Sequence, residues 1–190
     1  MQPLTWLVAL APLAPLAVGC VPADLADRAP SRMAGSAFAA LCAALLVAVV
    51  AALAVAMQGV LGTGTFGMAG LGFGLYLDSL TASMLLLVTF VGTIVVRYSR
   101  NYLSGDPGQG RFTKWLCVTV GAVLLLIISG NLLQFAVAWF ATSLGLHRLL
   151  LFYPDRQAAV LAARKKFLAS QLGDLCLLTA AALIYWSLRS

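Results

Sequence analysis

Long runs of apolar residues, interrupted by short polar links, dominate the chain. The apolar runs cover roughly residues 3–22, 36–57, 77–98, 113–130, 131–153 and 165–188. A transmembrane helix needs about 20 predominantly apolar residues to cross the hydrocarbon core of a bilayer. The pattern therefore predicts an all-α membrane protein with about six transmembrane helices.

Two segments depart from this regular pattern. The first apolar run contains Pro3, Pro12 and Pro15, so we expect a kinked helix, which membrane proteins tolerate where neighbours satisfy the freed carbonyl groups. The segment of residues 59–75 is Gly-rich and alternates small with apolar residues. This alternation favours a short hairpin or a re-entrant loop over a helix.

Asp78 stands directly before the third predicted helix. An aspartate at such a position can accept hydrogen bonds from backbone N–H groups that have no partner in the first helical turn. We therefore predict a structural role for Asp78 as the N-cap of this helix. Trp139 in the fifth predicted helix is likewise expected to be structural.

The composition supports a membrane protein and excludes a soluble enzyme. Hydrophobic residues make up 62% of the chain, charged residues 9%, and the mean hydropathy is +0.99. A soluble domain usually carries about 25% charged residues. The chain has no phosphate loop, GxSxG, HExxH or dinucleotide motif, so we expect a transport subunit rather than an enzyme.

The cysteine and histidine content gives no reason to expect a metal or a cofactor. Four cysteines without CxxC spacing lie in or at the end of apolar runs, and we interpret them as buried small apolar residues. A single histidine cannot form a metal site by itself. We therefore expect no metal, haem or iron–sulfur group on this chain.

The net charge of +6 comes from basic residues in the links between apolar runs. Such a distribution indicates contact with a membrane surface and not with nucleic acid. Loops 1–2, 3–4 and 5–6 with their flanks hold Arg28, Arg32, Arg97, Arg100, Arg111, Lys114, Arg156, Arg164, Lys165 and Lys166. The opposite side holds Arg189 alone. Because cytoplasmic loops carry the excess of Lys and Arg, we predict that these three loops are cytoplasmic and both termini external.

Asp174 is the most informative ionisable residue. It lies about nine residues into the sixth predicted helix, roughly 14 Å along its axis and near the bilayer centre. An ionisable group there costs several kcal/mol unless it is paired or hydrated. We expect a basic residue on a neighbouring helix, a file of water molecules or a further chain to hold it.

Four other residues are candidates for a proton path. A free histidine side chain exchanges its proton near neutral pH, which makes His147 a candidate for proton transfer. Arg148 beside it could equally extend to the interface as a structural anchor. Lys165 and Lys166 begin the sixth predicted helix at the cytoplasmic face. Their simplest interpretation is as positive anchors, and a proton-path role is the alternative.

Motifs from residue 76 onward resemble the antiporter-like subunits of respiratory complex I, in particular the large L-type subunit. In chain order they are Leu77-Asp78-Ser79-Leu80-Thr81, Tyr98-Ser99-Arg100-Asn101-Tyr102-Leu103-Ser104-Gly105-Asp106-Pro107, Arg111-Phe112, Asn131-Leu132-Leu133, Trp139, Lys165-Lys166-Phe167 and Gly173-Asp174. The resemblance implies two regions. Residues 1–75 are an N-terminal two-helix region with a Gly-rich loop, and residues 76–190 are the first part of a proton-antiporter-like transmembrane domain.

One departure separates this chain from proton-pumping complex I subunits. In that family a glutamate needed for pumping follows the tryptophan of the fifth helix, whereas Phe140 follows Trp139 here and the chain contains no glutamate. The segment of residues 142–156 instead resembles the DabB subunit of bacterial inorganic-carbon accumulation complexes.

That resemblance implies a function and a partner. The membrane subunit pairs with a large zinc-binding, carbonic-anhydrase-like subunit of the DabA type, and proton or cation flow drives hydration of CO2 to bicarbonate. Asp174, His147, Arg148, Lys165 and Lys166 would carry or tune the path, in the cell inner membrane.

Subunits of this kind normally run to a dozen or more helices, whereas this chain stops after about six. We therefore expect a fragment, a frameshifted product or a split subunit completed by a second chain. Two alternatives remain: a complex I or cation/proton antiporter subunit, and a structural membrane protein without transport.

Overall fold

The computed structural model describes residues 6–63, 66–68, 71–152 and 157–189 of the chain. The main helices are α2 Leu10–Gly19, α3 Ala23–Arg28, α4 Pro30–Gln58, α5 Ser79–Tyr102, α6 Gln109–Ile127, α7 Leu132–Leu150 and α8 Gln157–Arg189. Four short strands lie between α4 and α5: β1 Leu61–Gly62, β2 Phe66–Met68, β3 Leu71–Phe73 and β4 Tyr76–Leu77. The all-α membrane fold predicted from the apolar runs is confirmed.

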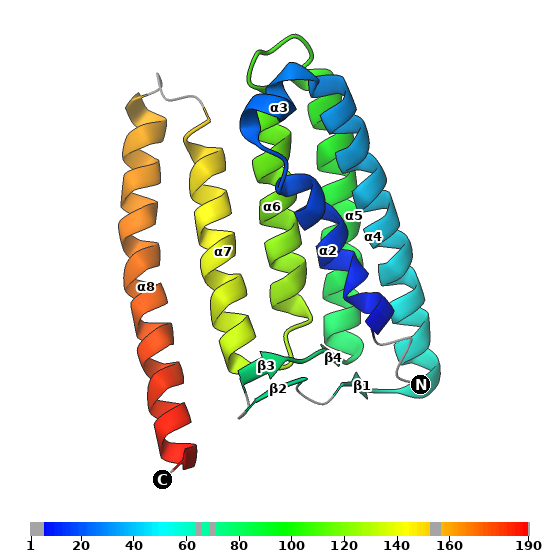
Figure 1. Cartoon of the computed structure of the whole chain (residues 1–190), viewed down its shortest axis with the longest axis vertical. Coiled ribbons are helices and arrows are strands. Elements are labelled where there is room, and N and C mark those ends of the chain that lie inside the picture. Colours follow the sequence, from blue (N-terminus) through cyan, green and yellow to red (C-terminus); the bar gives the residue numbers. More distant parts are fainter. Residues whose placement is uncertain (1–5, 64–65, 69–70, 153–156, 190) are drawn as a thin grey trace.

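The long helices run side by side and alternate in direction (Figure 1). The strands and the α6–α7 turn lie at one end of the bundle, whereas α3, the α5–α6 connection, the end of α7 and the start of α8 lie at the other. The start of α2 and the end of α8 are therefore at the same end. The links that carry the basic residues, by contrast, meet at the opposite end.

Four helices of the described part are long and apolar enough to cross a membrane: Pro30–Gln58, Ser79–Tyr102, Gln109–Ile127 and the segment Val160–Ile184 of α8. The apolar helical segment Trp6–Gly19 is shorter than a span. The predicted run 3–22 is therefore too long, because the chain leaves the helix after Gly19 and turns into α3. Helix α7, with 19 residues, has a length near that of a span, but its polar residues lower its hydropathy.

A hairpin or a re-entrant loop is predicted for residues 59–75, and the described residues of this segment form antiparallel strand pairs. Strand β1 pairs antiparallel with β4, and β2 pairs antiparallel with β3. The strands attach to the α6–α7 turn, because the Gly130 N–H donates to the carbonyl of Gly74 over 2.9 Å and the Tyr76 N–H to that of Ile128 over 3.2 Å. A Cβ on Gly130 would lie 2.8 Å from the backbone of Gly74, so glycine permits this close contact.

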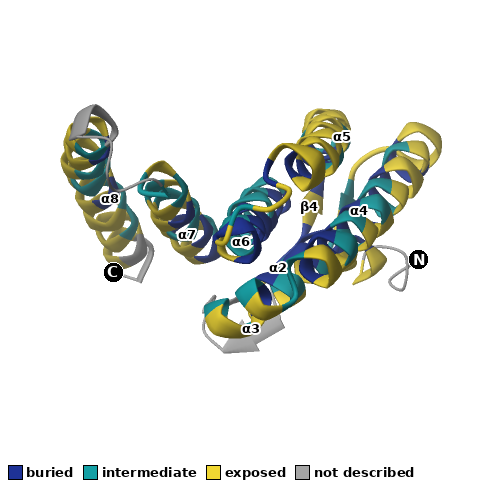
Figure 2. Ribbon diagram, turned by 90° about the horizontal axis from the view of Figure 1, so that it is seen from above, coloured by how far each residue is buried: buried dark blue, intermediate teal, exposed yellow. Residues whose placement is uncertain are grey.

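Helix α6 lies at the centre of the packed part of the bundle, against α2, α3, α4, α5 and α7 (Figure 2). Glycines allow its neighbours to approach: a Cβ on Gly110 would meet the backbone of Ala26 in α3 at 2.1 Å, and one on Gly145 of α7 would meet Thr119 at 2.5 Å. Small residues at helix interfaces are the usual means by which membrane helices pack closely.

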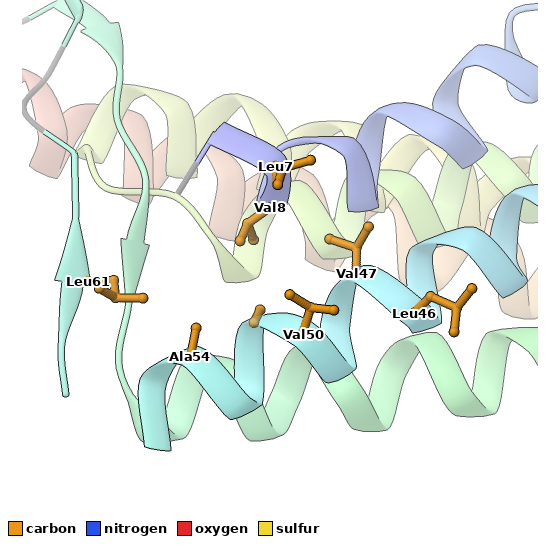
Figure 3. A pocket seen from close by; sticks show the side chains of 8 residues that line it. Leu7, Val8, Leu46, Val47, Val50, Ala54 and Leu61 are labelled. Carbon is orange, nitrogen blue, oxygen red and sulfur yellow. The ribbon is translucent and has the colours of Figure 1, made fainter. Parts of the chain in front are cut away.

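An apolar cavity of about 170 Å³ lies between the first helical segment, α4 and β1 (Figure 3). Its lining consists of Leu7, Val8, Leu46, Val47, Val50, Ala51, Ala54 and Leu61. Because no lining side chain carries a polar or ionisable group, this cavity offers no chemistry for proton transfer.

Helix α8 lies at the edge of the bundle and packs mainly on α7 (Figures 1 and 2). It begins at Gln157, eight residues before Lys165. The prediction that Lys165 and Lys166 begin this helix is therefore wrong, because the apolar and alanine-rich residues before them continue the helix. Asp174 consequently lies near the middle of α8.

Candidate functional site

Helices α7 and α8 face each other through a line of polar side chains, which we name the α7–α8 polar seam. It comprises Trp139, Ser143 and His147 on α7, and Lys166, Ser170 and Asp174 on α8. On each helix these residues are four positions apart, so they lie on one face, one above the other. Since the two helices are antiparallel (Figure 1), Trp139 lies opposite Asp174, and Ser143 lies opposite Ser170.

Asp174 is buried in this seam, with 4% of its surface exposed. The indole Nε1–H of Trp139 donates a hydrogen bond to its Oδ1 over 2.9 Å. The other carboxylate oxygen, Oδ2, is buried and has no hydrogen-bond partner among the described residues. The carboxylate therefore faces α7, where a neutral indole donates to it. The sequence alone leaves a basic residue, water molecules or a further chain open as its partner.

Two serines lie one helical turn from this pair. The Oγ atoms of Ser143 and Ser170 hydrogen-bond to each other across the helix interface. The Nζ of Lys166 donates to the carbonyl oxygen of Ser143 over 3.2 Å and lies 3.5 Å from its Oγ. The ammonium group of Lys166 is thus anchored to α7 rather than to Asp174, which is two turns or about 12 Å away along α8.

His147 lies at the far end of the seam. Its imidazole packs against the ring of Phe167 with the ring centroids 4.6 Å apart. Its Nδ1 is buried and has no hydrogen-bond partner among the described residues. The seam therefore contains two buried polar atoms without a protein partner, at opposite ends of the serine pair.

Arg148 and Lys165 do not join the seam. Both side chains are exposed, and the guanidinium of Arg148 lies over the ring of Trp115 at 5.3 Å from its centroid. The structure thus separates the five predicted proton-path residues: Asp174, Lys166 and His147 face the α7–α8 interface, and the other two face away.

The two residues predicted to be structural both make hydrogen bonds. Asp78 caps α5, since its Oδ1 accepts from the backbone N–H of Thr81 over 2.7 Å. This hydrogen bond holds the pKa of the Asp78 carboxyl below its ordinary value of 3.8. Trp139, expected only as a structural residue, is the direct partner of Asp174.

The sequence interpretation missed Ser143 and Ser170. The available signal was their spacing, because Ser143 lies midway between Trp139 and His147, and Ser170 midway between Lys166 and Asp174. Serines in apolar helices usually bond to their own backbone, so spacing without the facing helix could not single them out.

The described residues contain no group of three or more His, Cys, Asp or Glu side chains that could hold a metal ion. The four cysteines are free. Cys117 is buried as predicted, whereas Cys20 and Cys176 are exposed on the outer faces of their segments.

Two family models match the chain. Residues 65–113 match the model described as NADH-ubiquinone oxidoreductase (complex I), chain 5 N-terminus. Residues 129–189 match the model described as NADH:quinone oxidoreductase/Mrp antiporter, TM. The second match contains the whole α7–α8 polar seam.

Curated relatives point to the same group of proteins. The chain is 48% identical over 104 residues to the probable inorganic carbon transporter subunit DabB of Hydrogenovibrio crunogenus, covering 54% of this chain and 20% of that protein. It is 47% identical over 118 residues to DabB2 of Halothiobacillus neapolitanus, covering 62% and 21%. NAD(P)H-quinone oxidoreductase chain 5 of Synechocystis is 36% identical over 124 residues, covering 65% and 18%. The matched part is thus about a fifth of the length of these relatives.

The fold also has a solved counterpart. The membrane-bound sulfane sulfur reductase, an archaeal respiratory membrane complex, contains a chain that superposes with a TM-score of 0.79 at 19% sequence identity. The superposition covers 97% of this chain and 37% of that one. At this identity the likeness concerns the fold alone.

Proposed function

Since the chain belongs to the antiporter-like membrane subunits of the NADH:quinone oxidoreductase and Mrp antiporter type, we propose that it serves in inorganic carbon accumulation. In this proposal it is a membrane subunit that supplies a proton or cation path. The path drives a large zinc-binding, carbonic-anhydrase-like partner of the DabA type, which hydrates CO2. The identities of 48% and 47% to two DabB subunits support this branch of the family.

The observation that carries the proposal is the buried carboxylate of Asp174 near the middle of a membrane helix. A charge at that depth costs several kcal/mol, and such residues in membrane proteins commonly mark ion or proton pathways. Here one oxygen is held by Trp139, and the other has no hydrogen-bond partner in the part of the chain that the structure describes. A carboxylate in this arrangement has a fixed position and one oxygen able to take up and release a proton.

The remaining polar residues of the seam fit the ends of such a path. Lys166 and His147 lie two turns from Asp174, toward the end of the bundle where the basic links meet (Figure 1). Arg148 and Lys165, which are exposed, would interact with lipid headgroups at that end. The excess of basic residues at that end supports a cytoplasmic location for it in this proposal, with both termini on the external side of the inner membrane.

A quinone-linked role is the second candidate. The 36% identity to NAD(P)H-quinone oxidoreductase chain 5 favours it. Phe140 opposes it, because the resemblance to proton-pumping subunits implies a glutamate at this position. The two candidates share the path through Asp174 and differ in the partner to which it is coupled.

Co-purification from mild detergent, followed by mass spectrometry and zinc analysis, separates the candidates. We expect a large zinc-containing subunit to remain bound, together with any chain that completes the helix bundle. Subunits of a quinone oxidoreductase would assign the chain to respiration instead. Recovery of the chain without any partner would contradict both candidates and favour a structural fragment.

Asp174→Asn tests the path itself, because the amide keeps the size of the side chain but cannot carry the proton. We expect CO2-dependent growth supported by the complex to be lost while the amount of purified complex stays within about twofold of the wild type. An equal loss of complex and of function would leave only a folding role for Asp174.

A further inference from the structure

The residues that begin and end the proposed path are too far apart for direct proton transfer. Lys166 and Asp174 are eight residues apart on one helix, which corresponds to about 12 Å along the axis. A proton donor and acceptor must approach to about 2.6–3.2 Å, or be joined by one water molecule. Proton transfer between Lys166 and Asp174 therefore requires an intermediate group that accepts the proton from one side and releases it to the other.

The hydroxyl pair of Ser143 and Ser170 lies at the midpoint. Ser170 is four residues from both Lys166 and Asp174, and Ser143 is four residues from both Trp139 and His147. Each separation is one turn, about 6 Å along the axis. Two hydrogen bonds of about 2.8 Å through one water molecule span this length.

Two buried atoms indicate where the water molecules belong. Only 4% of the Asp174 surface is exposed. Among the described residues, neither its Oδ2 nor the Nδ1 of His147 has a hydrogen-bond partner. Buried polar atoms in proteins nearly always have a hydrogen-bond partner, and an ordered water supplies it where the protein does not. These two atoms lie on opposite sides of the serine pair, so they indicate one site for a water molecule on each side of it.

We propose that the hydroxyls of Ser143 and Ser170 form the central relay of the path, in direct contact with the Lys166 ammonium, whose Nζ lies 3.5 Å from the Ser143 Oγ. One water molecule joins the relay to Asp174, and another joins it to His147. Each hydroxyl accepts a proton on one lone pair and releases its own proton to the next acceptor. The serines are therefore unchanged after one transfer, and no other reactant is required. This inference rests on the proposed proton path through Asp174 and adds two residues to it.

A structural role for the serines is the competing explanation, because hydroxyl groups also join membrane helices. The neighbouring residue provides a matched control. Thr142 carries a hydroxyl on the same helix, but its Oγ1 donates to the carbonyl of Ala138 within α7 over 2.7 Å. Thr142→Val therefore removes a hydroxyl from α7 without touching the relay.

The test uses the full chain, co-purified with its partner and reconstituted into lipid vesicles, with proton flux measured after a pH step. We expect Ser143→Ala and Ser170→Ala each to lower the proton flux about tenfold. Removing a dedicated proton-transfer group would lower it roughly 100-fold or more. The effect of the serine variants is smaller because a water molecule can partly replace a hydroxyl. Ser170→Thr, which keeps the hydroxyl, should stay within about threefold of the wild type, and Thr142→Val should not change the flux.

The outcomes distinguish failure of the serine relay from failure of the proposed proton path through Asp174. If Asp174→Asn stops the flux and both serine-to-alanine variants conduct at the wild-type rate, the relay is wrong and the proposed path stands. Equal losses in Ser170→Ala and Ser170→Thr would assign the serines to helix packing and also overturn the relay. An unchanged flux in Asp174→Asn would overturn the proposed path and the relay with it.

Discussion

Helices α6 and α8 are held in the bundle by opposite means. A third of the membrane-spanning residues of α6 are buried, against 6% of those of α8. Helix α6 is surrounded by helices and contacts them through glycines and apolar side chains. Helix α8 packs mainly on α7, and the buried side chains among its described residues are those of Ala163 and Asp174.

The difference follows from which interactions stabilise helix association in a bilayer. Lipid tails are as apolar as leucine, so burying an apolar side chain against another helix gives little advantage over leaving it in lipid. Close packing and hydrogen bonds between helices must therefore supply the association energy. The centre of the bundle is held by close packing, whereas the α7–α8 polar seam is held by hydrogen bonds between the two helices.

The largest effect should follow from filling a glycine contact at the centre. In Gly110→Ala the new Cβ would lie 2.1 Å from the carbonyl oxygen of Ala26, and backbone atoms cannot move aside as a side chain can. We expect a loss of about 3 kcal/mol or more, at the upper end of the cost of overpacked cores, measured as a lower unfolding temperature in detergent. Gly173→Ala on α8 is the control, since nothing lies within 4 Å of its added Cβ.

An unchanged unfolding temperature in Gly110→Ala would show that α3 is not firmly packed on α6. A loss in Gly173→Ala equal to that in Gly110→Ala would remove the contrast between the two regions.

A smaller effect should follow from removing the indole donor at the seam. Trp139→Phe leaves the buried Asp174 carboxylate without its hydrogen bond, which costs about 1–3 kcal/mol for an unsatisfied buried group. Combined with Asp174→Asn the loss should shrink, because an amide is easier to bury than a carboxylate. A double-mutant cycle on the stability in detergent measures this coupling.

Trp186→Phe serves as the control for this cycle, because Trp186 lies on the same helix as Asp174 and is 77% exposed. Additive losses for the Trp139 and Asp174 variants would show that the hydrogen bond between them contributes nothing to the stability of the helix pair.

The smallest effect concerns the helix caps, which differ between the two regions. Asp78 caps α5 with a carboxylate, and Asn131 caps α7 with an amide whose Oδ1 accepts from Leu133 and Gln134. The pKa of Asp78 is lowered in the folded chain, so its stabilisation is complete above the ordinary value of 3.8 and is lost as the pH falls through the lowered pKa. The α7 cap does not titrate.

Hydrogen exchange at the first turns of α5 and α7 measures this difference. Between pH 6 and pH 3, the first turn of α5 should lose protection relative to that of α7, after correction for intrinsic exchange rates. In Asp78→Asn the two turns should respond alike. A wild-type α5 that keeps its relative protection at low pH would contradict the assignment of Asp78 as the titrating cap.

Much of the architecture could be predicted from the chain because the bilayer imposes a simple rule on it. Apolar runs of about 20 residues predict helices, and the Gly-rich segment before Asp78 predicts a hairpin. Helix ends were less predictable. Helix α8 extends back to Gln157, because alanines and basic residues are good helix formers whether or not they lie in the membrane.

The candidate site could likewise be predicted only in part from the sequence. The depth of Asp174 in an apolar run follows from the sequence, and with it the expectation that the carboxylate needs a partner. Which residue provides that partner depends on how α7 and α8 lie against each other, and a carboxylate could equally have met a lysine. Only the tertiary structure decided that an indole holds Asp174 and that two serines meet beside it, because the pairing of facing side chains is set by the register between helices, which no local pattern encodes.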